Sequence, residues 1–158
     1  MAQEIFTFLS SFGYLGAFLI SLIGSSTIIL PLPAGTFIFS LGPFLNPIIL
    51  GITAGLGATL GEFSGYALGY GGGKIAQNYI KNQMVKAKEM FKKYGGFFVI
   101  ILFAATPLPD DIVGILAGLL KYEVKKFFLA VFIGKTIFYL ILAFAGRYGI
   151  NWFLNYFF

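Results

Sequence analysis

The sequence predicts an all-α integral membrane protein, built as an inverted repeat with two re-entrant helical hairpins, about three transmembrane helices and additional interfacial helices. Hydrophobic residues make up 58% of the 158 residues and charged residues 11%, with a mean hydropathy of +0.88, so lipid must cover much of the apolar surface. The tripeptide Pro-Leu-Pro interrupts two apolar stretches, at 31–33 and again 76 residues later at 107–109. Duplicated breaks of this kind are typical of transporters built from internal repeats.

The elements follow from the apolar segments and their breaks. Three stretches are long enough to cross a hydrocarbon core of about 30 Å as helices: 5–23, 46–72 and 127–146. The first lacks the basic region of a signal peptide and is expected to be retained. The broken stretches 25–45 and 95–120 favour re-entrant hairpins, because proline interrupts each helix halfway. The aromatic tail 151–158 is too short to cross and is expected at the interface.

Residues 1–158 are expected to form a single membrane domain. Repeat one covers about 25–72 and repeat two about 95–147, joined by a basic linker at 73–94. Lysines flank the second broken stretch on both sides, so a hairpin that enters and returns keeps both groups on the cytoplasmic face of the plasma membrane. The first broken stretch then enters from the opposite face, and the two tips meet near the midplane.

The linker is the most basic part of a chain whose net charge is +5. It has one acid, Glu89, and six lysines: Lys74, Lys81, Lys86, Lys88, Lys92 and Lys93. Its apolar residues recur at steps of three and four, which predicts an amphipathic helix on the membrane surface: Ala76, Ile80, Met84, Ala87 and Phe91. The lysines set the topology or also bind anionic lipid headgroups. Nucleic acid is not the expected partner, because the run joins two membrane segments.

Small residues line the second span. Glycine recurs at every fourth position, at Gly57, Gly61, Gly65, Gly69 and Gly73. Such a row lets another helix approach closely in lipid. The row predicts close helix packing and leaves room for a homodimer.

Four charged residues lie inside apolar surroundings: Glu62, Asp110, Asp111 and Lys135. Each costs about 2.5–3.5 kcal/mol at the bilayer centre, so each needs a partner, water or protonation. Two alternatives are open for Glu62. It pairs with Lys135, or it lines a wet cavity and exchanges a proton or cation.

The two tips differ in chemistry. Asp110 and Asp111 follow the second break directly, where they can cap a helix and also bind a proton or small cation. The first tip offers backbone N–H groups and hydroxyls that suit an anion such as a lipid phosphate. The candidate headgroup or tip residues are Ser26, Pro31, Pro33, Gly35 and Thr36 in the first hairpin, and Thr106, Pro107 and Pro109 in the second.

The sequence offers no chemistry for an enzyme. It has no His and no Cys, and it contains no nucleophile–base pair or metal motif. We therefore expect no catalytic residues, no metal site and no cofactor.

The chain resembles the DedA/VTT superfamily, also called SNARE-associated Golgi proteins, over roughly residues 10–149. The resemblance rests on the Pro-rich stretch 26–42, on GATLGEFSGYALGYGGGK at 57–74 and on FAATPLPDDIVGILAG at 103–118. In the second motif Glu62 occupies the acidic position and Tyr66 the aromatic one. Ser26 and Gly35 stand where many relatives carry acids, and Ala105 or Thr106 where many carry arginine, which suggests a divergent branch.

The resemblance implies two re-entrant hairpins and the scrambling of phospholipid or flipping of polyprenyl-phosphate carriers, often linked to a proton or sodium gradient. We therefore expect a transporter of phospholipid or of a lipid-phosphate headgroup. Glu62, Asp110, Asp111 and Lys135 are the candidate residues for transport and coupling. A secondary exporter of a small cationic solute and a non-transporting membrane scaffold are the alternatives.

Overall fold

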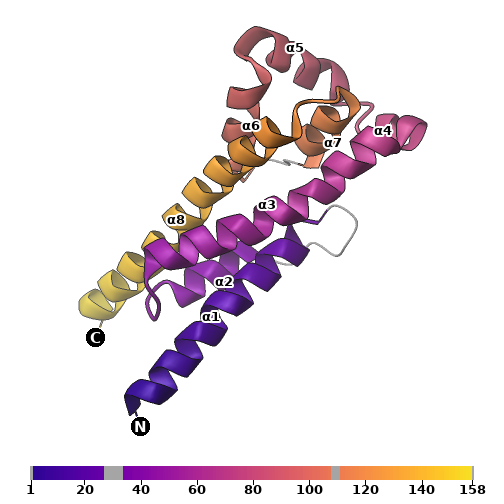
Figure 1. Ribbon diagram of the computed structural model, residues 1–158. Coiled ribbons are helices and arrows are strands. Elements are labelled where there is room, and N and C mark those ends of the chain that lie inside the picture. Colours follow the sequence, from indigo (N-terminus) through magenta and orange to yellow (C-terminus); the bar gives the residue numbers. More distant parts are fainter. Residues whose placement is uncertain (1, 27–33, 108–110, 158) are drawn as a thin grey trace.

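The computed structural model describes residues 2–26, 34–107 and 111–157, and every regular element in these ranges is a helix (Figure 1). The helices are α1 (Ala2–Gly24), α2 (Ala34–Leu41), α3 (Pro47–Gly71), α4 (Gly73–Tyr79), α5 (Met84–Tyr94), α6 (Gly96–Ala104), α7 (Asp111–Leu119) and α8 (Val124–Phe157). The all-helical class predicted from the sequence is confirmed for this part of the chain.

Two long helices, α3 and α8, form the centre of the molecule and run antiparallel (Figure 1). The start of α3 faces the middle of α8, where a Cβ on Gly51 would lie 2.6 Å from Leu140 Cδ2. One turn later, a Cβ on Gly55 would lie 2.5 Å from Thr136 Oγ1. The absence of side chains at these glycines lets the two backbones approach closely, as in membrane helix pairs.

Local sequence explains where α3 begins. Asn46 is its N-cap, and the side chain accepts hydrogen bonds from the backbone N–H groups of Ile48 and Ile49. Pro47 occupies the first helical position, where no N–H is needed. The helix ends at a run of three glycines, of which Gly73 has a φ of +48° that favours glycine.

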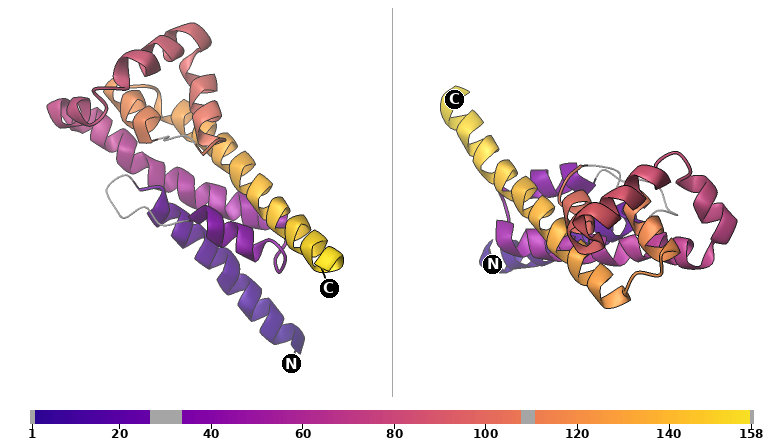
Figure 2. Two further views of the ribbon diagram at one scale, coloured as in Figure 1. Left: turned by 180° about the vertical axis from the view of Figure 1, so that it is seen from behind. Right: turned by 90° about the horizontal axis from the view of Figure 1, so that it is seen from above.

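The expected second and third spans are confirmed as long apolar helices. By length and composition, Pro47–Gly71 and Val124–Tyr156 are the two helices in the described ranges that could cross a membrane. The expected first span, 5–23, lies within α1, but its described apolar segment is the shorter Phe12–Gly24. The helix that contains the expected third span 127–146 is α8, and it is longer than expected: it continues through the aromatic tail to Phe157. Figure 2 shows the last turns of α8 projecting beyond the neighbouring helices.

The glycine row of α3 packs against helices of the same chain. Gly57 and Gly61 lie on the backbone of α1, and a Cβ on Gly57 would collide with the carbonyl of Phe18. Gly69 lies on the backbone of α7, where a Cβ would collide with the carbonyl of Ile115. Intramolecular packing therefore uses this row, which the sequence had left open to a second copy.

The linker differs from the single amphipathic helix that we expected. It forms α4 and α5, separated by a turn at residues 80–83. Three of its apolar residues, Ala76, Ile80 and Ala87, face inward and form a buried cluster with Ile115 and Leu116 of α7. These residues of the linker are thus covered by protein, because α7 packs beneath them, whereas Ile75, Tyr79 and Val85 remain exposed beside the lysines.

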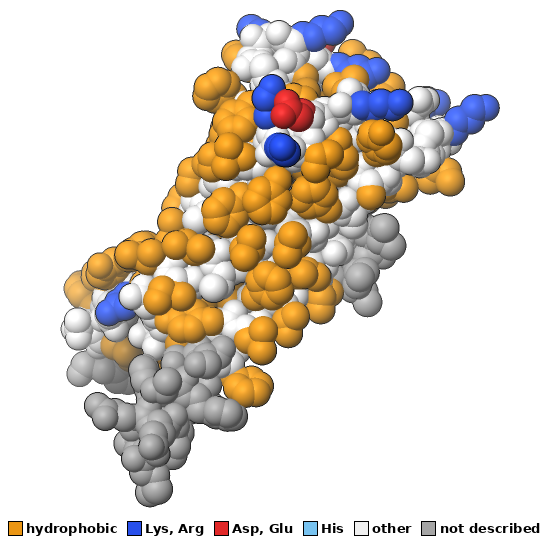
Figure 3. Space-filling model, in the orientation of Figure 1, with side chains coloured by type: hydrophobic (Ala, Val, Ile, Leu, Met, Phe, Trp, Pro, Cys, Tyr) orange, Lys and Arg blue, Asp and Glu red, His pale blue; other side chains and the backbone are white. Residues whose placement is uncertain are grey.

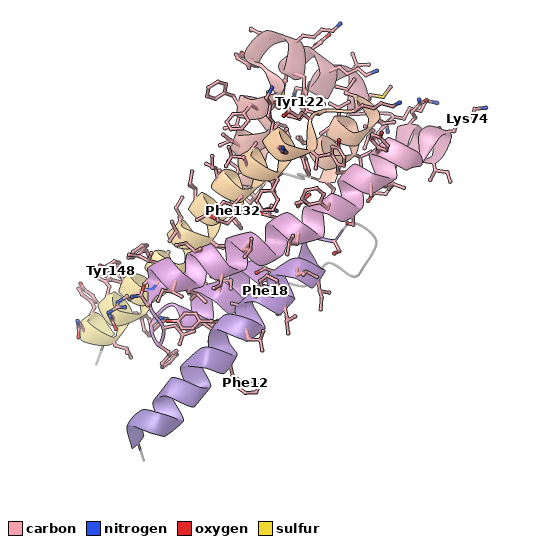
Figure 4. The ribbon with its side chains drawn as sticks, in the orientation of Figure 1. Phe12, Phe18, Lys74, Tyr122, Phe132 and Tyr148 are labelled. Carbon is pink, nitrogen blue, oxygen red and sulfur yellow. The ribbon has the colours of Figure 1, made fainter. Side chains whose placement is uncertain are left out.

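Charge is distributed unequally between the two ends of the molecule. Lysines gather on α4, α5 and the start of α8, and hydrophobic side chains cover the middle of the visible face (Figure 3). Lys74 extends outward at the tip of α4 (Figure 4). Arg147, in the second half of α8, is the one basic residue toward the opposite end of the described chain. This arrangement matches the bias of basic residues toward one face of a membrane.

Candidate functional site: a buried ion pair where four helices meet

A buried ion pair joins the two central helices. Lys135 Nζ on α8 lies 3.0 Å from Glu62 Oε1 on α3, and the two residues are only 7% and 2% exposed. The contact satisfies the distance of an ion pair without the alignment of a hydrogen bond. The antiparallel packing of α3 and α8 brings together two residues that are 73 positions apart. The pairing that the sequence left open is therefore present.

The carboxylate also faces the second broken stretch. A Cβ on Gly114 of α7 would lie 3.4 Å from Glu62 Oε2, so the glycine makes room for the acid. Beside the pair lies a cavity of about 10 Å³, lined by Glu62, Ile100, Ala104, Val113, Gly114, Phe127 and Val131. That volume is roughly the space of one water molecule. Glu62 consequently pairs with Lys135 and also lines a small cavity between α3, α6, α7 and α8.

The energetics of such a pair are asymmetric. Charges in a membrane-spanning helix are costly, and a mutual contact offsets part of the cost. Removing one partner leaves an uncompensated buried charge, at a cost of roughly 3–5 kcal/mol, whereas replacing both by apolar residues is often neutral. The pair is therefore a place where a small change of charge can alter the contacts between helices.

Aromatic packing surrounds the pair on the side of the basic end. Phe63 and Tyr66 of α3 contact Phe127 of α8, with ring centroids 5.5 and 4.8 Å apart. The Tyr66 hydroxyl donates a hydrogen bond to the carbonyl oxygen of Tyr122, in the turn where α6, α7 and α8 come together (Figure 4). No local pattern in the sequence indicates this hydrogen bond, although the spacing of Glu62 and Tyr66 by one helical turn places both on one face of α3.

The second broken stretch is described on both sides of residues 108–110. Asp111 is the first residue of α7 and is half-buried, as expected for an acid in the first turn of a helix. Thr106 Oγ1 donates a hydrogen bond to the Leu102 carbonyl oxygen at 2.9 Å, and Pro107 is exposed. Asp110 and Pro109 lie outside the described residues. Asp111 lies three residues before Gly114, which faces Glu62.

The described residues around the first break use their polar groups locally. Ser26 Oγ donates a hydrogen bond to the Leu22 carbonyl oxygen at 2.9 Å, at the end of α1. Gly35 and Thr36 belong to the first turn of α2, where Thr36 is exposed. Pro31 and Pro33 lie outside the described residues. The described part of the stretch 25–45 contains no charged side chain.

The flanks of both broken stretches reach α3 at adjacent residues. A Cβ on Gly61 would lie 3.0 Å from Ser25 Cβ, at the end of α1, and the next residue, Glu62, faces Gly114 of α7. The described flanks of the two broken stretches therefore approach the same level of α3. Within the described part of the chain, no three acidic, His or Cys side chains gather in a way that could hold a metal ion.

The fold and the site define an α-helical protein with two long apolar helices and a charged pair between them. A family model, the VTT domain, matches residues 32–148. The match covers more than two thirds of the 158 residues, so the chain belongs to the DedA/VTT family of membrane proteins. No curated protein and no solved structure matches the chain.

Proposed function

We propose that this protein moves phospholipid, or the headgroup of a lipid phosphate, across the bilayer, and that protonation of Glu62 drives the movement. The observation that carries the proposal is the buried ion pair between Glu62 and Lys135, in contact with α7. Ionisable side chains inside a membrane are rare and mark substrate pathways or proton relays.

The ion pair suggests two states. In the first, Lys135 is neutralised by Glu62 and the four helices are closely packed. In the second, Glu62 takes up a proton, its attraction for Lys135 is lost, and the ammonium group needs another anion. A phosphate headgroup supplies that anion, because an ammonium group is a compact point charge suited to phosphate. The small cavity beside Glu62 provides the first space for water or a proton carrier to enter.

We further propose that the two broken stretches, 25–45 with α2 and 95–120 with α6 and α7, are re-entrant hairpins of an inverted repeat. Reciprocal packing supports this arrangement. Gly42, in the turn directly after α2, lies against the backbone of α8 at Ala143, and Gly118 of α7 lies against the backbone of α3 at Tyr66. Each hairpin thus packs on the long helix of the other half.

The orientation follows from charge. We propose that the protein lies in the plasma membrane with the end bearing α4 and α5 in the cytoplasm, since nine of its lysines gather there: Lys74, Lys81, Lys86, Lys88, Lys92, Lys93, Lys121, Lys125 and Lys126. This is the bias that orients membrane proteins.

The test is reconstitution of the purified chain in liposomes with a fluorescent phospholipid. Dithionite added outside destroys only exposed label, so the fraction quenched reports movement between leaflets. Wild type and the exposed-charge control Glu123→Gln should move lipid at the same rate. The double variant Glu62→Met/Lys135→Met keeps the side chains long and apolar, and it should fold but move lipid at least tenfold more slowly. The proposal is abandoned if wild type moves no lipid, or if the folded double variant moves it equally well.

A further inference from the structure

We propose that the groove between α5 and α6 binds one acyl chain of an anionic phospholipid, with the headgroup held by Lys86 and Lys93. This site is separate from the Glu62–Lys135 pair. The inference requires that the chain lies in a membrane, and it does not require transport.

The groove is an apolar hollow on the described surface at the basic end of the molecule. It has a volume of about 570 Å³ and is lined by apolar and aromatic side chains, among them Met90, Tyr94, Phe98, Leu102 and Ala105. Its volume lies within the range of small-molecule sites in proteins. Phe98 and Leu102 are 70% and 52% exposed, so the groove opens to the surroundings rather than into the core.

The groove runs along α6 within one leaflet. Tyr94, the last residue of α5, lies at its basic end, and the lining residues of α6 follow from Phe98 to Ala105, at the break before α7. At 1.5 Å per residue the α6 positions span roughly 10 Å, about a third of a hydrocarbon core of about 30 Å. An acyl chain that starts at the basic end can therefore lie in the groove down to the level of the break.

The lysines of α5 beside the groove indicate that the lipid has an anionic headgroup. Lys86 precedes Met90 by one helical turn and Lys93 follows it by three residues, so both lie on the side of α5 that borders the groove. Lys93 Nζ lies 5.0 Å from the centroid of the Tyr94 ring, which lines the groove. Two ammonium groups at the mouth of an apolar groove complement a phosphate above an acyl chain.

A second copy of this chain is a poorer occupant. In a symmetric dimer across this groove, the lysines of one α5 would face those of the other. Like charges in that position oppose association, whereas an anionic lipid neutralises them.

The experiment places a fluorescent reporter in the groove. Trp152 is the only tryptophan of the chain, so Trp152→Phe combined with Phe98→Trp gives a single reporter at an exposed groove position. The purified full chain is reconstituted with phosphatidylglycerol or phosphatidylcholine whose acyl chains carry bromine, which quenches nearby tryptophan. We expect phosphatidylglycerol to quench several-fold more effectively than phosphatidylcholine at low mole fraction.

Matched charge variants decide the assignment. One lysine near an anionic lipid corresponds to roughly a fivefold preference, so Lys86→Gln/Lys93→Gln should abolish most of the selectivity. Lys74→Gln/Lys81→Gln removes the same amount of charge from α4 and the turn after it, and this variant should keep the preference for phosphatidylglycerol. Equal quenching by both lipids, or an equal loss in both charge variants, would overturn the proposal. Absence of quenching by either lipid would mean that protein covers the groove, which also overturns it.

Discussion

Two backbone contacts between helical segments of this molecule are similarly close and differ in chemistry. Where α2 meets α8, Gly42 lies on the backbone at Ala143, and where α7 meets α3, Gly118 lies on the backbone at Tyr66. Both glycines approach so closely that an added Cβ would collide with a carbonyl oxygen. These glycines are separated by the same 76 residues as the two Pro-Leu-Pro breaks. The same spacing in the sequence thus corresponds to the same type of backbone contact.

The residues one turn earlier distinguish the two contacts. In the first, Ile38 precedes Gly42 by four residues and belongs to an apolar buried cluster with Tyr139. In the second, Gly114 precedes Gly118 by four residues and faces the carboxylate of Glu62. The closeness of the backbones and the polarity of the contact are therefore set by different residues, one helical turn apart. A single turn of helix can therefore become charged without loss of the packing beside it.

The largest expected effect comes from breaking the ion pair of the second contact. Lys135→Met leaves the Glu62 carboxylate buried without its counter-ion, and we expect a loss of roughly 3–5 kcal/mol of stability. Glu62→Met/Lys135→Met makes this contact apolar like the first and should restore most of that loss. Thermal denaturation of the detergent-purified chain, followed by size-exclusion chromatography, measures both. A double variant as unstable as the single one would contradict the comparison.

The glycines test whether the two contacts are equally close. Gly42→Ala and Gly118→Ala should each lower stability by about 1–3 kcal/mol, because each added methyl group meets backbone that cannot rotate away. Gly71→Ala is the matched control, since nothing lies within 4 Å of its added Cβ. Thermal denaturation should place both variants well below the control. A strong effect at Gly118 and none at Gly42 would show that the resemblance between the contacts is superficial.

The smallest expected effect concerns the turns that follow the two contacts. The Tyr66 hydroxyl donates to the carbonyl of Tyr122, and the Tyr14 hydroxyl accepts from the backbone N–H of Asn46. Tyr66→Phe should cost about 1 kcal/mol, because the hydroxyl belongs to a buried residue. Tyr14→Phe should cost less, since the Asn46 N–H is exposed and water can replace the hydroxyl. Their melting temperatures are compared with that of Tyr79→Phe, an exposed tyrosine; an equal change there would exclude a role for these bonds.

The fold was predictable to the extent that local sequence specifies it. Asn46-Pro47 starts α3 and the glycine run after Tyr70 ends it, so the span expected at 46–72 agrees with the helix to within a residue. The linker was less predictable. Its apolar residues recur at helical spacing, but that spacing cannot distinguish a face that meets lipid from one that meets α7.

The candidate site was predictable in its members and not in its geometry. Glu62 and Lys135 stand out as charges within apolar segments, because such charges need partners. Their pairing depended on the antiparallel register of α3 and α8, which no local pattern encodes. The contact of Gly114 with Glu62 could not be predicted, because no local pattern distinguishes a glycine that makes room for a distant carboxylate from other glycines.

The sequence by itself determined the apolar character of the chain, the positions of the two breaks and the membership in the DedA/VTT family. These depend on composition and on neighbours along the chain. Only the tertiary structure decided that the glycine row of α3 packs on α1 and α7, that Glu62 contacts Lys135, and that one contact is apolar while its counterpart is charged. The reason is that these features join segments far apart in sequence, whose proximity arises only when the helices pack.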